Sequence, residues 1–99
     1  MLVHSVFFWL KPELTDEQRA DFRKGVESLG GIGDAAAVYV GTPAATADRP
    51  VIDTSYDVGL TVILEDVAAH DRYQEHALHL AFLENFRTYW QRVQIYDVD

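Results

Sequence analysis

The stretch "LVHSVFFWL", residues 2–10, carries apolar side chains at both its odd and its even positions. Side chains alternate across a strand, so the two sets lie on opposite faces of a sheet. One face carries Leu2, Val6, Phe8 and Leu10 beside His4, and the other carries Val3, Phe7 and Trp9 beside Ser5. This pattern predicts a strand that is buried on both faces. Lys11-Pro12 ends it, because proline cannot donate to the hydrogen-bond ladder.

The next stretch, "TDEQRADFRKGVESLGG" at residues 15–31, predicts a helix. Thr15 and Gln18 fit a capping box, and Gly30-Gly31 ends the helix. One apolar stripe follows the i, i+4, i+7 spacing: Phe22, Val26 and Leu29. Gly25 in the helix interior costs up to about 1 kcal/mol relative to alanine. Close packing against a sheet or against a ligand would explain this glycine, and both explanations stay open.

The rest of the chain alternates between strand and helix patterns. These patterns predict strands at 35–41, 55–65 and 93–98, an irregular loop at 42–54, and a helical region at 66–90. In that region Asp66 is a good N-cap for a first helix that runs to about Glu75, and a break near His76 precedes a second helix. The second helix carries one apolar stripe: Leu80, Leu83, Phe86 and Trp90.

This order of elements, β-α-β-β-α(α)-β, is typical of the ferredoxin-like fold, an α+β fold with a four-stranded antiparallel sheet and helices on one face. The chain has 99 residues, so we expect a single domain over residues 1–99. The other face of the sheet is then uncovered, although residues 2–10 are apolar on both faces. A monomer rarely exposes such a patch. We therefore expect a homodimer that forms through the open sheet face, as a dimeric α+β barrel.

The composition narrows the classes of partner. The net charge is −8, with sixteen acidic against eight basic residues, which argues against nucleic acid and against anionic membrane surfaces. The chain has no cysteine, which excludes disulfides and thiolate metal sites. The first ten residues are apolar but too short to span a bilayer, and they lack the basic region and cleavage site of a signal peptide. A cytoplasmic location is the default expectation.

The stretch "RYQEHALHLAF", residues 72–82, spaces Tyr73, His76 and His79 three residues apart. His76 and His79 can lie on one helix face, and imidazole suits zinc, copper, nickel or iron. A stable site needs at least three protein ligands, and "HALH" lacks the glutamate of the HExxH motif. We therefore predict no metal and no other cofactor, while a third ligand remains open among His4, His70 and Glu75.

The same three residues also suit acid–base chemistry. Steps of three turn about 300° around a helix, so Tyr73, His76 and His79 drift slowly round one side and can face one cavity. A histidine exchanges protons readily near neutral pH, and a tyrosine–histidine pair can move a proton beside a carbonyl. The alternative is structural: half-buried tyrosine and histidine can cap helix ends and brace the mouth of the barrel.

With these elements and residues, the chain resembles the stress-responsive A/B barrel family (the Dabb domain). The resemblance rests on "VHSVFFWLK", "YQEHALHLAF" and "YWQRVQIYD", and it extends over essentially the whole chain. The late family motif reads like H-P-x-H-x-x-F, and here Ala77 stands in place of the proline. The resemblance implies a ferredoxin-like subunit and a dimeric barrel.

The best understood enzymatic relatives are plant polyketide cyclases, which close a poly-β-keto chain into a ring without metal or organic cofactor. The resemblance implies that their catalytic tyrosine and histidine correspond to Tyr73 and His79. It implies substrate-binding positions at His4, His76 and Trp90, and we add Phe22 to the predicted lining. Arg23 and Val26 stand where those cyclases carry aromatic residues, which argues against a long polyketide substrate.

We therefore expect a homodimer with a small-molecule pocket that takes a carbonyl-bearing or aromatic metabolite. If the protein is an enzyme, we expect cofactor-free, cyclase- or lyase-like acid–base catalysis. His79 would be the general base or acid, Tyr73 would polarise the oxygen, and His4 and His76 would support them. Two alternatives stay open: a non-enzymatic stress-responsive structural or binding module, and a cofactor-independent monooxygenase of a related dimeric barrel type.

Overall fold

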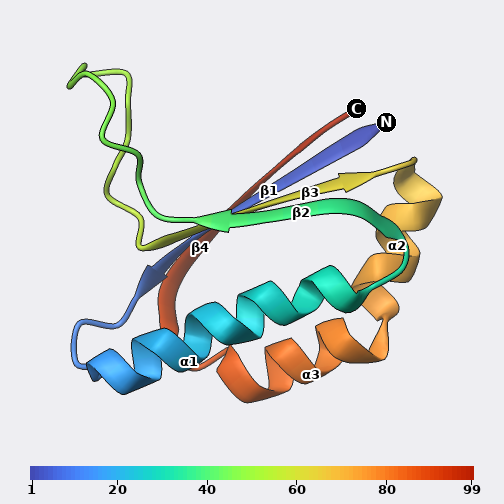
Figure 1. Ribbon diagram of the computed structural model, residues 1–99, viewed down its shortest axis with the longest axis horizontal. Coiled ribbons are helices and arrows are strands. Elements are labelled where there is room, and N and C mark those ends of the chain that lie inside the picture. The colour runs from blue at the N-terminus through green and yellow to red at the C-terminus, as the bar shows by residue number, and fades with distance from the viewer.

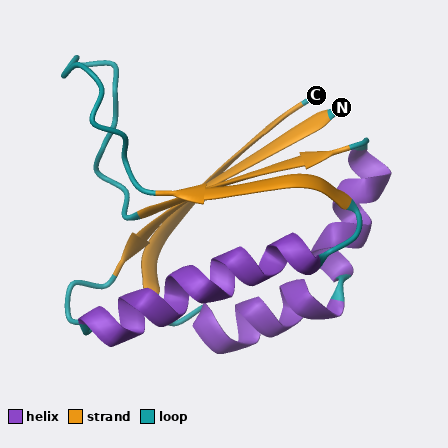
Figure 2. Ribbon diagram, viewed as in Figure 1, coloured by secondary structure: helices purple, strands orange, loops and turns teal.

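The computed structural model describes residues 1–99 as one sheet layer and one helix layer (Figure 1). The elements are β1 (Leu2–Leu10), α1 (Asp16–Glu27), a short 3-10 helix η1 (Ser28–Gly31), β2 (Ala35–Gly41), β3 (Val58–Leu64), α2 (Val67–Glu75), α3 (Ala77–Phe86) and β4 (Trp90–Val98). The strands pair in the order β2-β3-β1-β4, all antiparallel. Figure 2 shows all the helices on one side of the sheet, which confirms the predicted α+β ferredoxin-like fold.

Strand β1 lies in the middle of the sheet and pairs with both β3 and β4. Its first residues face the last residues of β4, with Val3 opposite Val98, so the two chain ends lie side by side (Figure 1). The register with β4 shifts between Trp9 and Leu10, and this irregularity places Trp90 opposite Leu10. The first and the last strand of the sequence are therefore direct neighbours.

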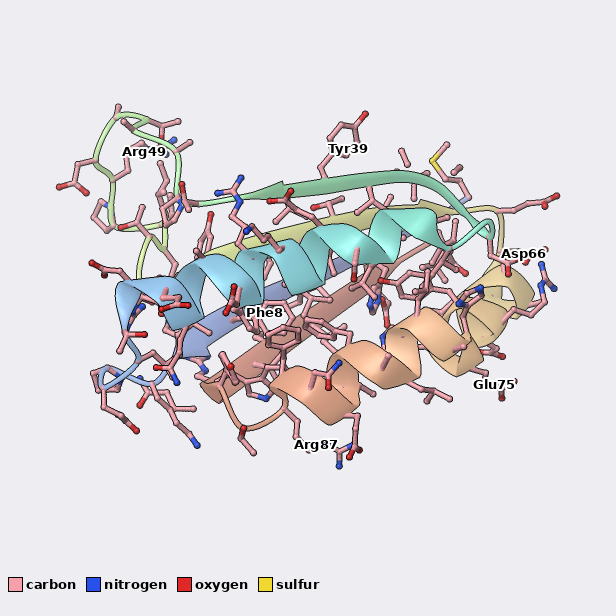
Figure 3. The ribbon with its side chains drawn as sticks, turned by 60° about the horizontal axis from the view of Figure 1, so that its bottom comes forward. Phe8, Tyr39, Arg49, Asp66, Glu75 and Arg87 are labelled. Carbon is pink, nitrogen blue, oxygen red and sulfur yellow. The ribbon has the colours of Figure 1, made fainter.

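The core lies between the helices and one face of the sheet. In β1 the even-numbered residues are at most 5% exposed, whereas the odd-numbered residues are half-buried. Strand β3 shows the same alternation. Figure 3 shows Phe8 between the sheet and the helices, while Tyr39 on β2 points away from the helices. The predicted separation of β1 into two apolar faces is confirmed, and only one of them is covered by this chain.

Helix α1 begins as the sequence predicts. The Thr15 hydroxyl accepts a hydrogen bond from the Gln18 N–H at 3.1 Å, and the Gln18 side-chain oxygen accepts one from the Thr15 N–H at 2.8 Å. Gly25 has a packing role: a Cβ atom there would lie 2.4 Å from Cε2 of Phe86. The close neighbour that explains this glycine is therefore helix α3, and neither the sheet nor a ligand.

Three predicted boundaries are wrong. Strand β3 begins at Val58 instead of residue 55, helix α3 ends at Phe86 instead of near residue 90, and β4 begins at Trp90 instead of residue 93. Trp90 continues the helical spacing of Leu83 and Phe86, but its pairing with Leu10 in the sheet prevails. Leu80, a member of the apolar stripe predicted for the second helix, is 54% exposed.

The segment between β2 and β3 is irregular, as predicted for residues 42–54, and it projects beyond the end of the sheet (Figure 1). Its last residues are fastened to β1: the Leu10 N–H donates to Asp57 Oδ2 at 2.7 Å, and the Trp9 indole N–H donates to Ser55 Oγ at 3.0 Å. None of the helices combines the length and the apolar composition that crossing a membrane requires.

Candidate functional site

A cavity of about 150 Å³ lies between the covered face of the sheet and helices α2 and α3. Most of its lining is apolar, and its polar residues are His4, Tyr73, Gln74 and His79. A larger depression of about 500 Å³ lies at the surface near Met1 and Arg72. Two of the charged groups there already pair with each other, because Arg72 Nε lies 2.9 Å from Asp34 Oδ1. The smaller cavity is therefore the better candidate for a site.

The break between α2 and α3 positions two of the predicted residues. His76 has an extended backbone, with φ −62° and ψ 143°, and separates the last turn of α2 from the first turn of α3. Tyr73 and His79 stand on either side of this break, and their rings meet edge to face with centroids 5.1 Å apart. The predicted pair is thus brought together in one cavity wall.

His76 has a different place. Its Nδ1 accepts a hydrogen bond from the Leu78 N–H at 3.0 Å, so its side chain caps the start of α3. It is half-buried and is not among the residues that line the cavity. Because this nitrogen already accepts a backbone hydrogen bond, His76 has the helix-capping role that was the structural alternative to catalysis.

Two polar atoms in the cavity wall lack partners. The Tyr73 hydroxyl and the His79 Nδ1 are buried, and neither has a hydrogen-bond partner in the protein. Most buried polar atoms in proteins are paired, and each unpaired one costs about 1–3 kcal/mol. A polar ligand or a bound water in the cavity would satisfy both.

His4 on β1 brings a third polar side chain to the cavity, and it is only 2% exposed. It lies opposite Asp97 of β4 in the sheet, and its Nδ1 is 2.5 Å from Asp97 Oδ1. Its ring centroid is 5.9 Å from that of Tyr73. A carboxylate that holds one ring nitrogen fixes the orientation and tautomer of an imidazole. Asp97 was not predicted from the sequence.

The environment of the cavity keeps Tyr73 and His79 neutral. Burial raises the pKa of Tyr73 well above its ordinary value of 10.0. Burial, and then the nearby His4 and His70, lower the pKa of His79 below its ordinary value of 6.5. At neutral pH Tyr73 is therefore a phenol that can donate a hydrogen bond, and His79 is an uncharged imidazole.

Phe22 and Trp90, the other predicted lining residues, have different positions. Trp90 lines the cavity and stacks on Phe82 with ring centroids 6.0 Å apart. Phe22 is fully buried behind the cavity wall, and its ring centroid lies 5.1 Å from that of Phe8.

One group of side chains has the composition of a metal site. It consists of His4, His70 and Asp97, which lie close together.

These features define a class: a small ferredoxin-like α+β subunit with a histidine- and tyrosine-containing cavity between its sheet and its helices. Residues 2–99 match the family described as Stress responsive A/B Barrel Domain, and the chain belongs to that family. No curated protein sequence matches the chain.

Structures of other proteins share the fold. A Dabb family protein from Mesorhizobium loti is 23% identical with a TM-score of 0.78, and the match covers 99% of this chain and 94% of that one. A dimeric ferredoxin-like protein from Thermobifida fusca is 17% identical with a TM-score of 0.79, and the match covers 98% and 88%. A hydroxynitrile lyase from Passiflora edulis is 18% identical with a TM-score of 0.80, and the match covers 98% and 90%. At these identities the likeness shows the fold.

Proposed function

We propose that the cavity binds a small carbonyl-bearing molecule and catalyses a cofactor-free acid–base reaction of cyclase or lyase type. The observation that carries this proposal is the pair of unpartnered buried atoms, Tyr73 Oη and His79 Nδ1, in a cavity that also contains an oriented His4. An apolar cavity with a few convergent polar groups is the usual form of a small-molecule site.

The cavity volume sets the size of the ligand. A cavity of about 150 Å³ accommodates a molecule of roughly one six-membered ring. This size supports a single-ring aldehyde, ketone or hydroxy compound as the substrate class. The small volume argues against a long polyketide chain as substrate. The replacement of aromatic residues by Arg23 and Val26 points the same way.

In the proposed mechanism, Tyr73 and His79 hold the oxygen of the substrate. The Tyr73 phenol donates to a carbonyl oxygen, and His79 donates from Nδ1 in the tautomer that carries its proton there. Two donors aimed at one oxygen stabilise the negative charge that develops on it when a neighbouring bond breaks. Both side chains are neutral at physiological pH, so the site keeps its donors without burying a charge in the resting state.

His4 then accepts the proton. With Nδ1–H donating to Asp97, the lone pair of His4 is on Nε2, the remaining ring nitrogen. The carbon next to the carbonyl gives its proton to Nε2, and the electron pair of that C–H bond forms an enolate. Asp97 stabilises the resulting imidazolium. The residue pattern alone favours His79 as the general base or acid. We favour His4, because burial and two neighbouring imidazoles disfavour a positive charge on His79.

The proposal includes a homodimer through the open sheet face. That face carries Phe7, Trp9 and Tyr56, with ring centroids 4.9 Å apart for Phe7 and Tyr56, and Tyr96 is 59% exposed. A patch of this aromatic composition is typical of an interface. The similar Thermobifida fusca protein is described as dimeric. Light scattering on the full chain tests this part: a monomeric mass at micromolar concentration would refute it.

Deuterium exchange tests the chemistry without knowledge of the final reaction. Single-ring ketones and aldehydes are first screened for ligand-dependent increases in melting temperature. Hits are then incubated in D₂O, and exchange at the carbon next to the carbonyl is followed by NMR. We expect exchange with the native chain and with Tyr39→Phe, which removes the hydroxyl of an exposed tyrosine on β2.

The variants separate binding from proton transfer. We expect Tyr73→Phe and His79→Gln to lose the melting shift, and His4→Gln to keep the shift but lose exchange. Melting shifts without exchange in the native chain would refute the catalytic mechanism and favour the binding module. The absence of any shift, or a shift that Tyr73→Phe retains, would refute the proposed site.

A further inference from the structure

A third imidazole lies beside the His4–Asp97 pair and has no role in the proposed mechanism. His70 on α2 places its Nε2 4.0 Å from Asp97 Oδ2, and its ring centroid is 5.1 Å from that of His4. Ligand atoms of His4, His70 and Asp97 all lie within 4.8 Å of one another. A strand at the sheet centre, a helix and an edge strand thus bring together two imidazoles and a carboxylate.

The neighbours of His70 determine which of its nitrogens carries the ring proton. Its Nδ1 is 3.2 Å from the carboxylate oxygen of Asp71, which can only accept, so the ring proton belongs on Nδ1. The lone pair is then on Nε2, which lies 4.0 Å from Asp97 Oδ2 and accepts a hydrogen bond from the Gln74 side-chain amide at 3.5 Å. A bound ion would displace this amide. A carboxylate behind the outer nitrogen of a histidine is the usual support for a metal-binding imidazole.

We propose that His4 Nδ1, His70 Nε2 and the Asp97 carboxylate bind a divalent ion of the zinc class. Two imidazoles and one carboxylate, with a fourth position open to water, form a common ligand set for such ions. Ligands at about 2.0–2.2 Å from a tetrahedral ion lie roughly 3.3–3.6 Å apart. The His4–Asp97 contact must therefore lengthen and His70 must approach. Both Asp97 and His70 reach solvent, with 42% and 20% of their side chains exposed, and can make this adjustment.

The ion takes the place of the proton between His4 and Asp97, and this has a consequence that rests on the proposed function. A neutral imidazole carries one proton. When the metal occupies Nδ1, that proton must be on Nε2. The nitrogen that accepts a substrate proton in the metal-free chain thereby becomes a donor. Metal binding would switch His4 Nε2 from base to hydrogen-bond donor, with only the local adjustment of Asp97 and His70 described above.

Calorimetric titration of the full chain with zinc chloride tests the site, with magnesium chloride as the control cation. We expect one zinc ion per chain and no heat from magnesium, which disfavours imidazole ligands. His70→Ala should weaken zinc binding about tenfold or more, and Asp97→Asn should do the same with almost no change in side-chain shape. His76→Gln is the matched control, because it removes a histidine that lies outside the cluster.

Three results would overturn the metal site: no zinc binding, His70→Ala that binds zinc as the native chain does, or equal loss in His76→Gln. This test uses no small molecule, so its outcome is independent of the proposed function. The switch is tested by deuterium exchange. Zinc should suppress exchange in the native chain but not in His70→Ala. Tight zinc binding with unchanged exchange would overturn the switch alone.

Discussion

The two faces of β1 are almost equally apolar in sequence, yet they differ in the structure. The even-numbered residues are covered by helices and at most 5% exposed, while the odd-numbered residues, among them Phe7 and Trp9, are half-buried. The covered face also holds the one polar residue, His4, that joins the candidate site. A strand can thus serve a core and a site on one face while it presents an apolar surface to a second molecule on the other.

The largest expected effect concerns the covered face. Phe8→Ala should lower the free energy of unfolding by about 3–5 kcal/mol, because it removes a buried ring and leaves a cavity. Urea denaturation measures this, and the loss should not depend on protein concentration. Phe7→Ala, one position along, is the matched control, and its cost should fall as the protein is diluted. If both variants lost the same free energy of unfolding at every protein concentration, the odd-numbered face would not be covered by a second chain.

A charged side chain on the open sheet face tests whether that face forms the homodimer. Phe7→Asp should weaken the proposed homodimer by about 3 kcal/mol, roughly a hundredfold, because an unpaired carboxylate would be buried in the interface. Analytical ultracentrifugation should then find monomers where the native chain is dimeric. Leu80→Asp on the exposed side of α3 should leave the mass unchanged. A Phe7→Asp chain that stays dimeric would locate the interface elsewhere.

Tyr73→Phe should affect stability and function in opposite directions. Removing an unpaired buried hydroxyl should leave the free energy of unfolding unchanged or raise it by up to about 1 kcal/mol, while ligand binding is lost. The raised pKa of Tyr73 also adds a pH effect. Above pH 10 the unfolded chain ionises this tyrosine and the folded chain does not, so native stability falls as pH rises. Alkaline urea titrations should show a smaller fall in Tyr73→Phe.

His79 gives the smallest expected effect, at acid pH. Its pKa is lowered in the folded chain, so its contribution to stability is present above pH 6.5 and is lost as pH falls below that value. The unfolded chain takes up the proton that the folded site resists. His79→Gln should therefore show a shallower loss of stability between about pH 6.5 and 5. If the free energy of unfolding of His79→Gln depended on pH as that of the native chain does, the folded site would accommodate a protonated His79.

Local signals made much of the fold predictable. The capping box at Thr15 and the break at His76 operate over a few residues, so both can be read directly. The three-residue spacing predicts one cavity for Tyr73, His76 and His79, and the structure brings only Tyr73 and His79 there, because His76 caps α3 at the break. Trp90 could not be placed, because it fits a helical period as well as a strand, and only its pairing with Leu10 decides between them.

Asp97 is the part of the site that the sequence could not reveal. Its partner His4 is 93 positions away, and their meeting depends on the register between β1 and β4. One residue of slippage would turn Asp97 to the opposite face of the sheet. The register irregularity near Trp9 means that counting forward along β4 from the Leu10–Trp90 pair would miss Asp97 by one residue.

The adjacency of the first and last strands also affects how the protein is made. During synthesis β1 emerges well before its neighbour β4, so one edge of this apolar strand stays unpaired until β4 has been made. Contacts of such long sequence separation form slowly, and exposed apolar strands promote aggregation in the meantime. We expect the His4–Asp97 contact to be completed late in folding, and the chain to depend on chaperones most strongly before β4 has been made.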